Sequence, residues 1–200
     1  MDIKKLLFKK IFNKISLNNN KKLILIDGIS CSGKTQFSNK LKSYLTSKKL
    51  KIKIISKDLF LKSRKERIKI LKKSKKNVIQ NRAHYDLKKF YFLIKNILKS
   101  KEQPKNIMFN NLYNRLTGKN DKSIKIRIDK NYIYIFEGIY IHQDLKNTNS
   151  TIIKILLVNN IFLSLSNKIE RIRDNQITVK EVFDEFVNIH LKSFLIYLKK

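Results

Sequence analysis

The segment from residue 23 to residue 47 constrains the fold of this chain more than any other. It reads LILIDGISCSGKTQFSNKLKSYLTS, which is a short apolar run, a loop with a glycine at each end, and a helical pattern. Residues 28–35, GISCSGKT, match the pattern G-x-x-x-x-G-K-[ST] in full. A buried strand before this loop and a helix after it are the context that the pattern requires. The segment therefore predicts a strand–loop–helix unit that holds a phosphate.

Each position of this loop has a chemical role. Gly28 and Gly33 let the backbone turn tightly, and the loop N–H groups at the start of the helix favour an anion. Lys34 is expected to reach the β- and γ-phosphates of a nucleotide, and the Thr35 hydroxyl is expected to ligate Mg²⁺. A tight turn that binds nothing is the alternative. The predicted ATP-binding residues are Gly28, Ile29, Ser30, Cys31, Ser32, Gly33, Lys34, Thr35 and Gln36.

Apolar strands alternate with helical patterns along the rest of the chain. Residues 51–56 read as a second strand, and residues 132–140 and 152–158 read as later strands. Residues 106–113 and 123–129 flank a turn-forming stretch and predict a β-hairpin. This alternation is typical of a parallel sheet. We expect an α/β fold of the P-loop NTPase type, with three layers, a mostly parallel five-stranded sheet and a small hairpin.

The N-terminal residues form a separate pattern. Residues 1–16 read as a basic amphipathic helix with Ile11 and Ile15 on one face, and the stretch SLNNNKK then interrupts it. No linker rich in Pro, Gly or Ser follows. We expect an amphipathic helical extension over residues 1–20 and a single domain over residues 21–200.

The composition bears on partners and compartment. The net charge is +31, but lysine is spread along the whole chain and far outnumbers arginine, as an AT-rich genome would produce, so no specific nucleic acid partner is expected. One cysteine fits a reducing cytoplasm, and no stretch is apolar enough to span a membrane. The scattered histidines and the cysteine form no zinc pattern, so His142 and His190 are expected to be surface or packing residues.

Three later segments resemble a known family. They are ISKDLFL at 55–61, IYIFEGIY at 133–140 and SNKIERIRDNQITVKEVFDEF at 166–186. Together with GISCSGKT, they resemble the uridine kinase and phosphoribulokinase family of P-loop small-molecule kinases. The resemblance extends from about residue 22 to residue 195. It implies the use of ATP and Mg²⁺, and a helical lid over the phosphates.

Two acidic residues at strand ends carry much of this resemblance. Asp58 matches the Asp of the family's D-x-F-Y element, which acts as a base toward the acceptor hydroxyl. Glu137 matches the strand end V-E-G, so the resemblance implies that it faces Mg²⁺ together with Asp58 and Thr35. Strand ends beside the loop are where parallel sheets bind ligands. A helix cap or an ion pair is the alternative for each acid, and the family's tyrosine is Leu61 here.

The lid segment matches the family's R-R-[IL]-x-R-D pattern incompletely. The family's leading arginines fall near Ser164 and Asn167, while Arg171 and Arg173 remain as candidates to close over the phosphates, with Lys168 in support. A solvated basic helix face is the alternative. A capping box from Thr178 to Glu181 then begins a long C-terminal helix. The predicted catalytic residues are Asp58, Lys34, Arg171 and Arg173.

The acceptor site is carried by the resemblance alone. NRAHYDLKKF resembles a [FY]-D stretch whose Asp binds acceptor hydroxyls, although true uridine kinases continue with His-Pro and a Leu-Lys pair follows here. LYNRLTGKND resembles the family's acceptor hairpin, but Arg115 sits too early to match its arginine. A structural role is the alternative for each residue. The predicted substrate-binding residues are His84, Tyr85, Asp86 and Tyr113.

These patterns lead to one expected activity. The chain is expected to transfer the γ-phosphoryl group of ATP to a hydroxyl of a small metabolite, with a nucleoside such as uridine or cytidine favoured by the resemblance. Another acceptor of the same family, such as pantothenate, a sugar or a sugar phosphate, is the first alternative. A nucleotide- or nucleic-acid-binding protein without turnover is the second. Assembly into a homo-oligomer is left open.

Overall fold

The computed structural model describes residues 3–17, 23–73, 82–100, 103–145, 152–158, 160–172, 178–192 and 194–195. Its centre is a parallel sheet in the order β2-β5-β1-β6. These strands are β1 (Leu23–Gly28), β2 (Lys51–Ser56), β5 (Tyr132–Glu137) and β6 (Ile152–Leu157). Every residue of β1 is buried, as expected of a central strand that is covered on both faces.

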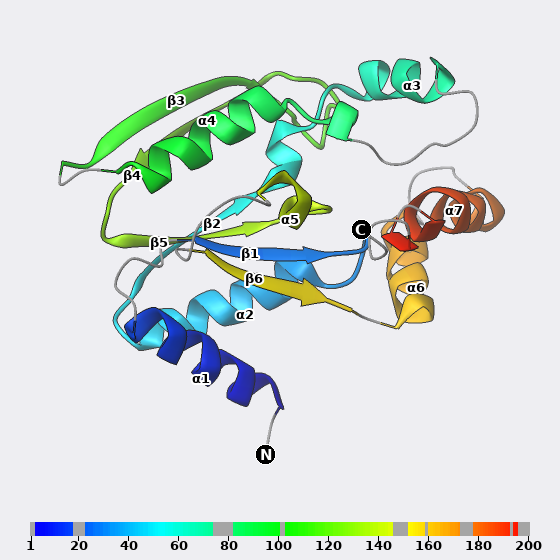
Figure 1. The fold of residues 1–200 in the computed structure, drawn as a ribbon. Helices are drawn as coiled ribbons and strands as arrows, with labels where there is room; N and C mark the ends of the chain where they lie inside the picture. Colours follow the sequence, from blue (N-terminus) through cyan, green and yellow to red (C-terminus); the bar gives the residue numbers. More distant parts are fainter. Residues whose placement is uncertain are drawn as a thin grey trace.

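Two helices cover one face of the sheet (Figure 1). They are α1 (Ile3–Ser16) and α2 (Lys34–Ser47). Phe8, Ile11 and Ile15 of α1 pack in one apolar cluster with Leu41 and Leu45 of α2. The cluster also contains the strand side chains on the face of the sheet that these two helices cover. The predicted amphipathic helix therefore lies against the core. Its separation from the domain at residue 20 stays a prediction, and residues 18–22 lie outside the described residues.

The opposite face is covered by α4 (Leu87–Leu98) and by a hairpin of β3 (Lys105–Leu112) and β4 (Lys122–Ile128) (Figure 1). Phe90 of α4 and Phe109 of β3 meet Phe60 and Phe136 in the second apolar cluster. The α/β class and the parallel sheet are confirmed. Among the described residues the main sheet has four strands instead of five, because β3 and β4 pair only with each other.

Most of the remaining elements lie beyond the carboxyl ends of the parallel strands, whereas α5 (Ile141–Asp144) packs over β1, with Ile141 and Leu145 in the second apolar cluster. Figure 1 shows α3 and the pair α6 and α7 on the side of the carboxyl ends of the strands. The elements are η1 (Lys57–Phe60), α3 (Arg64–Lys73), η2 (Arg82–His84), α5 (Ile141–Asp144), α6 (Ile161–Ile172), α7 (Val179–Glu185) and η3 (Phe186–Leu191).

Among the described residues, no helix is both long and apolar enough to cross a membrane.

Candidate active site

The loop between β1 and α2 has the geometry of an anion site. Gly33 is the N-cap of α2 with φ 83°, and no side chain caps this helix end. A Cβ at Gly28 would lie 2.7 Å from the carbonyl oxygen of Leu157 and 2.7 Å from Ser32 Oγ, so only glycine fits there. The N–H groups of the first turn of α2 are therefore not taken by a capping side chain, and such groups bind phosphate.

Lys34 lies inside this loop. Its Nζ donates hydrogen bonds to the carbonyl oxygens of Gly28 at 3.0 Å and Ile29 at 2.6 Å. Burial lowers the pKa of Lys34, while the nearby carboxylates of Glu137, Asp58 and Asp27 act in the opposite direction. The ammonium group is thus held inside the loop that is predicted to bind the phosphates.

Asp27 supports the loop, although the motif does not include it. The buried carboxylate accepts hydrogen bonds from the backbone N–H groups of Gly28 at 2.7 Å, Tyr140 at 2.8 Å and His142 at 3.0 Å. It therefore ties the start of the loop to the turn that follows β5. An acidic residue at the end of an otherwise apolar strand was the sequence signal for this role.

Glu137 and Asp58 come together at the ends of β5 and β2. The strand register places Glu137 beside both Ile26 and Ser56. Burial raises the pKa of Glu137, and the charge of Asp58 raises it further, while hydrogen bonds from Ser56 and Thr35 and the charge of Lys34 oppose the shift. The charge of Asp58 thus lies close enough to disfavour the ionised form of Glu137.

The same group fits a magnesium ion. Mg²⁺ is usually bound through one or two carboxylates and the phosphates of a nucleotide. Two neighbouring carboxylates and the Thr35 hydroxyl offer that set, and a cation would stabilise the ionised form of Glu137, which burial and the charge of Asp58 disfavour. The described residues contain no cluster of three or more His, Cys, Asp or Glu side chains, so the phosphates would supply the rest of the shell.

Asp58 is not needed as a helix cap. The N-cap of its own short helix η1 is Ser56, whose side chain accepts from the N–H of Asp58 at 3.3 Å. At the start of α3, Ser63 and Glu66 cap each other, with the Ser63 N–H donating to Glu66 at 3.0 Å. The alternative interpretation of Asp58 as a cap therefore finds no support in these contacts.

The buried side chain of Lys57 contacts Tyr85, one of the predicted substrate-binding residues. Lys57 is 1% exposed, and its Nζ donates to the Ile139 carbonyl oxygen at 2.8 Å and lies 4.3 Å from the centre of the Tyr85 ring. A Cβ at Gly138 would lie 2.6 Å from the Cβ of Lys57, so glycine is required for the chain to pass this side chain. Lys57 therefore links the Glu137 strand end to Tyr85, and sequence reasoning missed it.

One cavity of about 530 Å³ joins most of the predicted site. The loop residues 30–35, Asp58 and Glu137 line it together with His84, Tyr85 and Tyr113. The remaining lining residues are Ser56, Leu59, Leu61, Arg64, Arg67, Arg115, Lys122, Gly138, Ile139 and His190. Residues from six separate segments of the chain therefore meet at the carboxyl ends of the strands.

Asp86 lies outside this cavity. Its carboxylate accepts a hydrogen bond of 3.2 Å from the Lys89 N–H as the N-cap of α4, and lies 3.5 Å from Lys89 Nζ. A carboxylate at this position stabilises the helix by satisfying an unpaired N–H group. The structure thus gives Asp86 a capping contact, whereas the other three predicted substrate residues face the cavity.

The segment that is predicted to form a lid packs against the loop through α6. Asn167 donates from Nδ2 to the Cys31 carbonyl oxygen at 3.3 Å. Lys168 forms an ion pair of 2.9 Å with Glu185, and His190 contacts the same carboxylate at 3.1 Å. These partners, His190 first, lower the pKa of Glu185 to about 2. The side chain of Arg171 and the whole of Arg173 lie outside the described residues.

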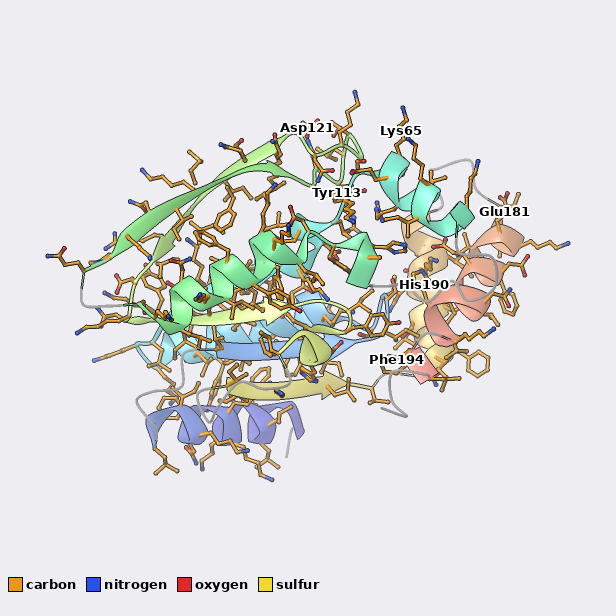
Figure 2. All side chains as sticks on the ribbon, turned by 45° about the horizontal axis from the view of Figure 1, so that its top comes forward. Lys65, Tyr113, Asp121, Glu181, His190 and Phe194 are labelled. Atoms are coloured by element: carbon orange, nitrogen blue, oxygen red, sulfur yellow. The ribbon has the colours of Figure 1, made fainter. Side chains whose placement is uncertain are left out.

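His190, which was expected only to pack or to lie at the surface, is a cavity residue. It is buried, as expected of a packing residue, but it also lines the cavity. Figure 2 shows Tyr113 beside the hairpin and His190 beside the C-terminal helices. The cavity is therefore bounded by the hairpin layer on one side and by the C-terminal helices on the other.

Comparisons with known proteins agree with this arrangement. The family model described as "Chromatin associated protein KTI12" matches residues 22–102, which is less than half of the chain. No curated protein matches the chain.

Several solved structures share the fold. A candidate fructose transport system kinase from a Silicibacter species has a TM-score of 0.74 at 16% identity, with 99% of this chain and 95% of that chain covered. A candidate uridine kinase from Bacillus stearothermophilus has a TM-score of 0.65 at 16% identity, with 96% and 90% covered. A D-glycerate 3-kinase from Cryptococcus neoformans has a TM-score of 0.59 at 12% identity, with 94% and 86% covered. The chain has the fold of these P-loop small-molecule kinases.

Proposed function

We propose that this protein is a kinase that transfers the γ-phosphoryl group of ATP to a hydroxyl group of a small metabolite. One observation carries the proposal. The phosphate-binding loop, the two strand-end acids and the side chains His84, Tyr85 and Tyr113 line a single cavity of about 530 Å³. A nucleotide-binding loop alone needs no such second set of polar groups. A transferase needs both substrates in one closed space.

The residues divide the chemistry between them. Lys34 and the N–H groups of the loop hold the phosphates and balance the charge that spreads over the γ-phosphoryl oxygens. Thr35 and Glu137 would hold Mg²⁺, which supplies further positive charge when bound. Asp58 accepts the proton of the acceptor hydroxyl while the new O–P bond forms. The bond between the γ-phosphorus and the bridging oxygen breaks, and ADP leaves.

The acceptor follows from the resemblance and the structural neighbours. The sequence resemblance favours a nucleoside such as uridine or cytidine, and one neighbour is a candidate uridine kinase. Other neighbours carry the names of fructose and D-glycerate kinases, so a sugar or a hydroxy acid is the alternative within the same reaction class. Pantothenate and sugar phosphates are further alternatives, and they are tested as acceptors in the same assay. We place this activity in the cytoplasm.

A function of another class has one observation in its favour. The KTI12 model covers the loop, Asp58 and α4, but this family is described as chromatin-associated and not as a metabolic kinase. A protein of this kind would bind a nucleotide without modifying a small molecule. Turnover is the property that separates the two proposals.

The test is ADP release in the presence of Mg²⁺ and ATP. Uridine, cytidine, fructose, fructose 6-phosphate, D-glycerate and pantothenate are offered one at a time, with Lys34→Ala as the inactive control. Acceptor-dependent ADP release, with a phosphorylated product seen by mass spectrometry, would support the kinase. ATP binding with no release above the Lys34→Ala background for any compound would favour the nucleotide-binding alternative.

A further inference from the structure

Basic side chains gather at one end of the cavity. Arg64 and Arg67 of α3, Arg115 of the hairpin turn and Lys122 at the start of β4 all line it. The composition of the chain does not account for this. Only seven of the 46 basic residues are arginines, yet three of the seven are here, together with only two lysines, Lys34 and Lys122.

Arg67 is held in one orientation. Its Nε donates to the Lys62 carbonyl oxygen at 3.1 Å, and its Nη2 donates to the Tyr113 hydroxyl at 2.8 Å. The guanidinium group also lies 4.9 Å from the centre of the Tyr113 ring. These two bonds use two of the five N–H donors of the side chain. The remaining donors belong to a half-buried, preorganised fork of the kind that binds carboxylate or phosphate.

The backbone of Arg64 is tied to the hairpin turn. Its backbone N–H donates to the Gly118 carbonyl oxygen at 2.8 Å, and Nε lies 3.3 Å from where a Cβ of Gly118 would stand. Asn120 donates from Nδ2 to the Leu61 carbonyl oxygen at 2.9 Å. The hairpin turn is thus attached to the segment before α3, which brings Arg115 and Lys122 to the same wall as Arg64.

No acidic side chain of the described cavity lining pairs with these arginines. The carboxylates in the lining are Asp58 and Glu137, and the contacts of Glu137 are with Ser56, Thr35 and Lys34. Two acids close to the cluster lie outside the lining and have other partners, since Glu66 binds Ser63 and Asp121 binds the Thr117 hydroxyl at 2.8 Å. The positive charge at this end of the cavity is therefore not balanced by an acidic side chain of the described cavity lining.

His84 completes this end. It is 6% exposed and lines the cavity, and its Nε2 is buried with no hydrogen-bond partner among the described residues. Burial lowers the pKa of His84, and the charges of Arg67 and Lys62 lower it further. Buried polar atoms are normally paired, so an unpaired ring nitrogen at a cavity wall indicates a place for a ligand atom.

We propose that the acceptor carries an anionic group, a phosphate monoester or a carboxylate, which Arg67 and Arg64 bind while its hydroxyl group faces Asp58. The inference rests on the proposed function and narrows its substrate class. It selects charged acceptors, such as a sugar phosphate or a hydroxy acid, over neutral nucleosides such as uridine and cytidine. Charge-assisted bonds from a fixed arginine give roughly tenfold or more in affinity for the charged member of a matched pair.

The test measures binding, so that it does not depend on turnover. The full chain is first saturated with Mg²⁺ and the non-hydrolysable analogue AMP-PNP, which fills the phosphate loop. Calorimetry then compares D-glycerate with glycerol, fructose 6-phosphate with fructose, and inorganic phosphate with no addition. We expect at least one charged compound to bind about tenfold or more tightly than its neutral partner. Equal binding within every pair, or no binding of any anion, would overturn the proposal.

Two variants test whether the arginines cause the preference for the charged compound. Arg67→Gln is expected to remove the preference for the charged compound and to leave the affinity for AMP-PNP within about twofold of wild type. Arg64→Gln, at an exposed position, is expected to reduce the preference and serves if Arg67→Gln fails to fold. Arg127→Gln is the matched control, because Arg127 lies on β4 outside the cavity lining. An equal loss of AMP-PNP and acceptor binding in Arg67→Gln would assign this arginine to the nucleotide and refute the inference.

The two proposals fail in different ways. If the charged compounds bind with Arg67 dependence but none is phosphorylated, the kinase proposal fails and the anion site stands. If a neutral nucleoside is phosphorylated at full rate by Arg67→Gln, the kinase proposal stands and the anionic acceptor is excluded.

Discussion

The carboxylate of Asp27 accepts a hydrogen bond of 2.8 Å from the backbone N–H of Tyr140, which is 113 residues away in the sequence. This contact joins the strand before the phosphate loop to the turn after the Glu137 strand. The loop and the acid proposed to hold Mg²⁺ are therefore fixed relative to each other before any ligand binds. Preorganisation of this kind reduces the rearrangement that binding and catalysis require.

The first prediction concerns this contact. Asp27→Ala leaves three backbone donors without their buried acceptor, and we expect it to lower the free energy of unfolding by about 2–4 kcal/mol. Urea denaturation measures the change. Asp184→Ala, at an exposed position on α7, is the control and should stay within about 0.5 kcal/mol of wild type. A loss in Asp27→Ala no larger than that of the control would mean that the contact adds no stability.

The second prediction tests the phosphate loop. Lys34→Ala should abolish phosphoryl transfer and weaken ATP binding, because the cation beside the β- and γ-phosphates is removed. Turnover and calorimetric ATP binding are the measurements. Lys40→Ala, an exposed lysine on the same helix, should behave as wild type. Near-normal turnover in purified Lys34→Ala would show that the loop does not act on ATP.

The third prediction separates chemistry from binding. Asp58→Asn keeps the size of the side chain but removes the proton acceptor, so we expect kcat to fall by about 10² to 10⁴-fold, with ATP affinity changed by less than about tenfold. Single-turnover kinetics at saturating Mg²⁺ gives the rate of the chemical step. Asp86→Asn is the comparison, and since asparagine also caps helices it should have little effect. The opposite order of effects would place the base at Asp86.

The fourth prediction concerns acid stability. The pKa of Glu185 is held at about 2 in the folded protein, against 4.5 for a free side chain, by His190 first and then Lys168. The stabilisation is therefore present above about pH 4.5 and is lost as the pH falls toward 2. Nearly half of the side chain is exposed, so the effect should be small. Unfolding free energies at several pH values should differ between wild type and Glu185→Gln near neutrality and converge near pH 2, whereas a constant difference would contradict this assignment.

The fifth prediction addresses the net charge of +31. If the lysines reflect composition, binding to random duplex DNA should be weak, with Kd about 10⁻⁴ to 10⁻⁶ M, and should fall steeply as salt is raised. A titration at two salt concentrations measures this. Sequence-selective binding at physiological salt would instead support a nucleic acid partner.

Short segments of the sequence were enough to predict the local structures. The glycines and Lys34 of the phosphate loop, the capping box from Thr178 to Glu181 and the apolar face of α1 all depend on residues a few positions apart. Their backbone geometry and hydrogen bonds are set by neighbours along the chain. The parallel sheet followed in the same way from the alternation of apolar strands and helices.

Contacts between distant residues were decided by the tertiary structure. Whether Asp86 would face the cavity or cap α4, and whether β3 and β4 would join the main sheet, depended on how the layers pack. The roles of Lys57 and Asp27 and the cluster around Arg67 depend on groups that approach only after folding, because a buried charge takes its partners from whichever segments the packed core brings beside it.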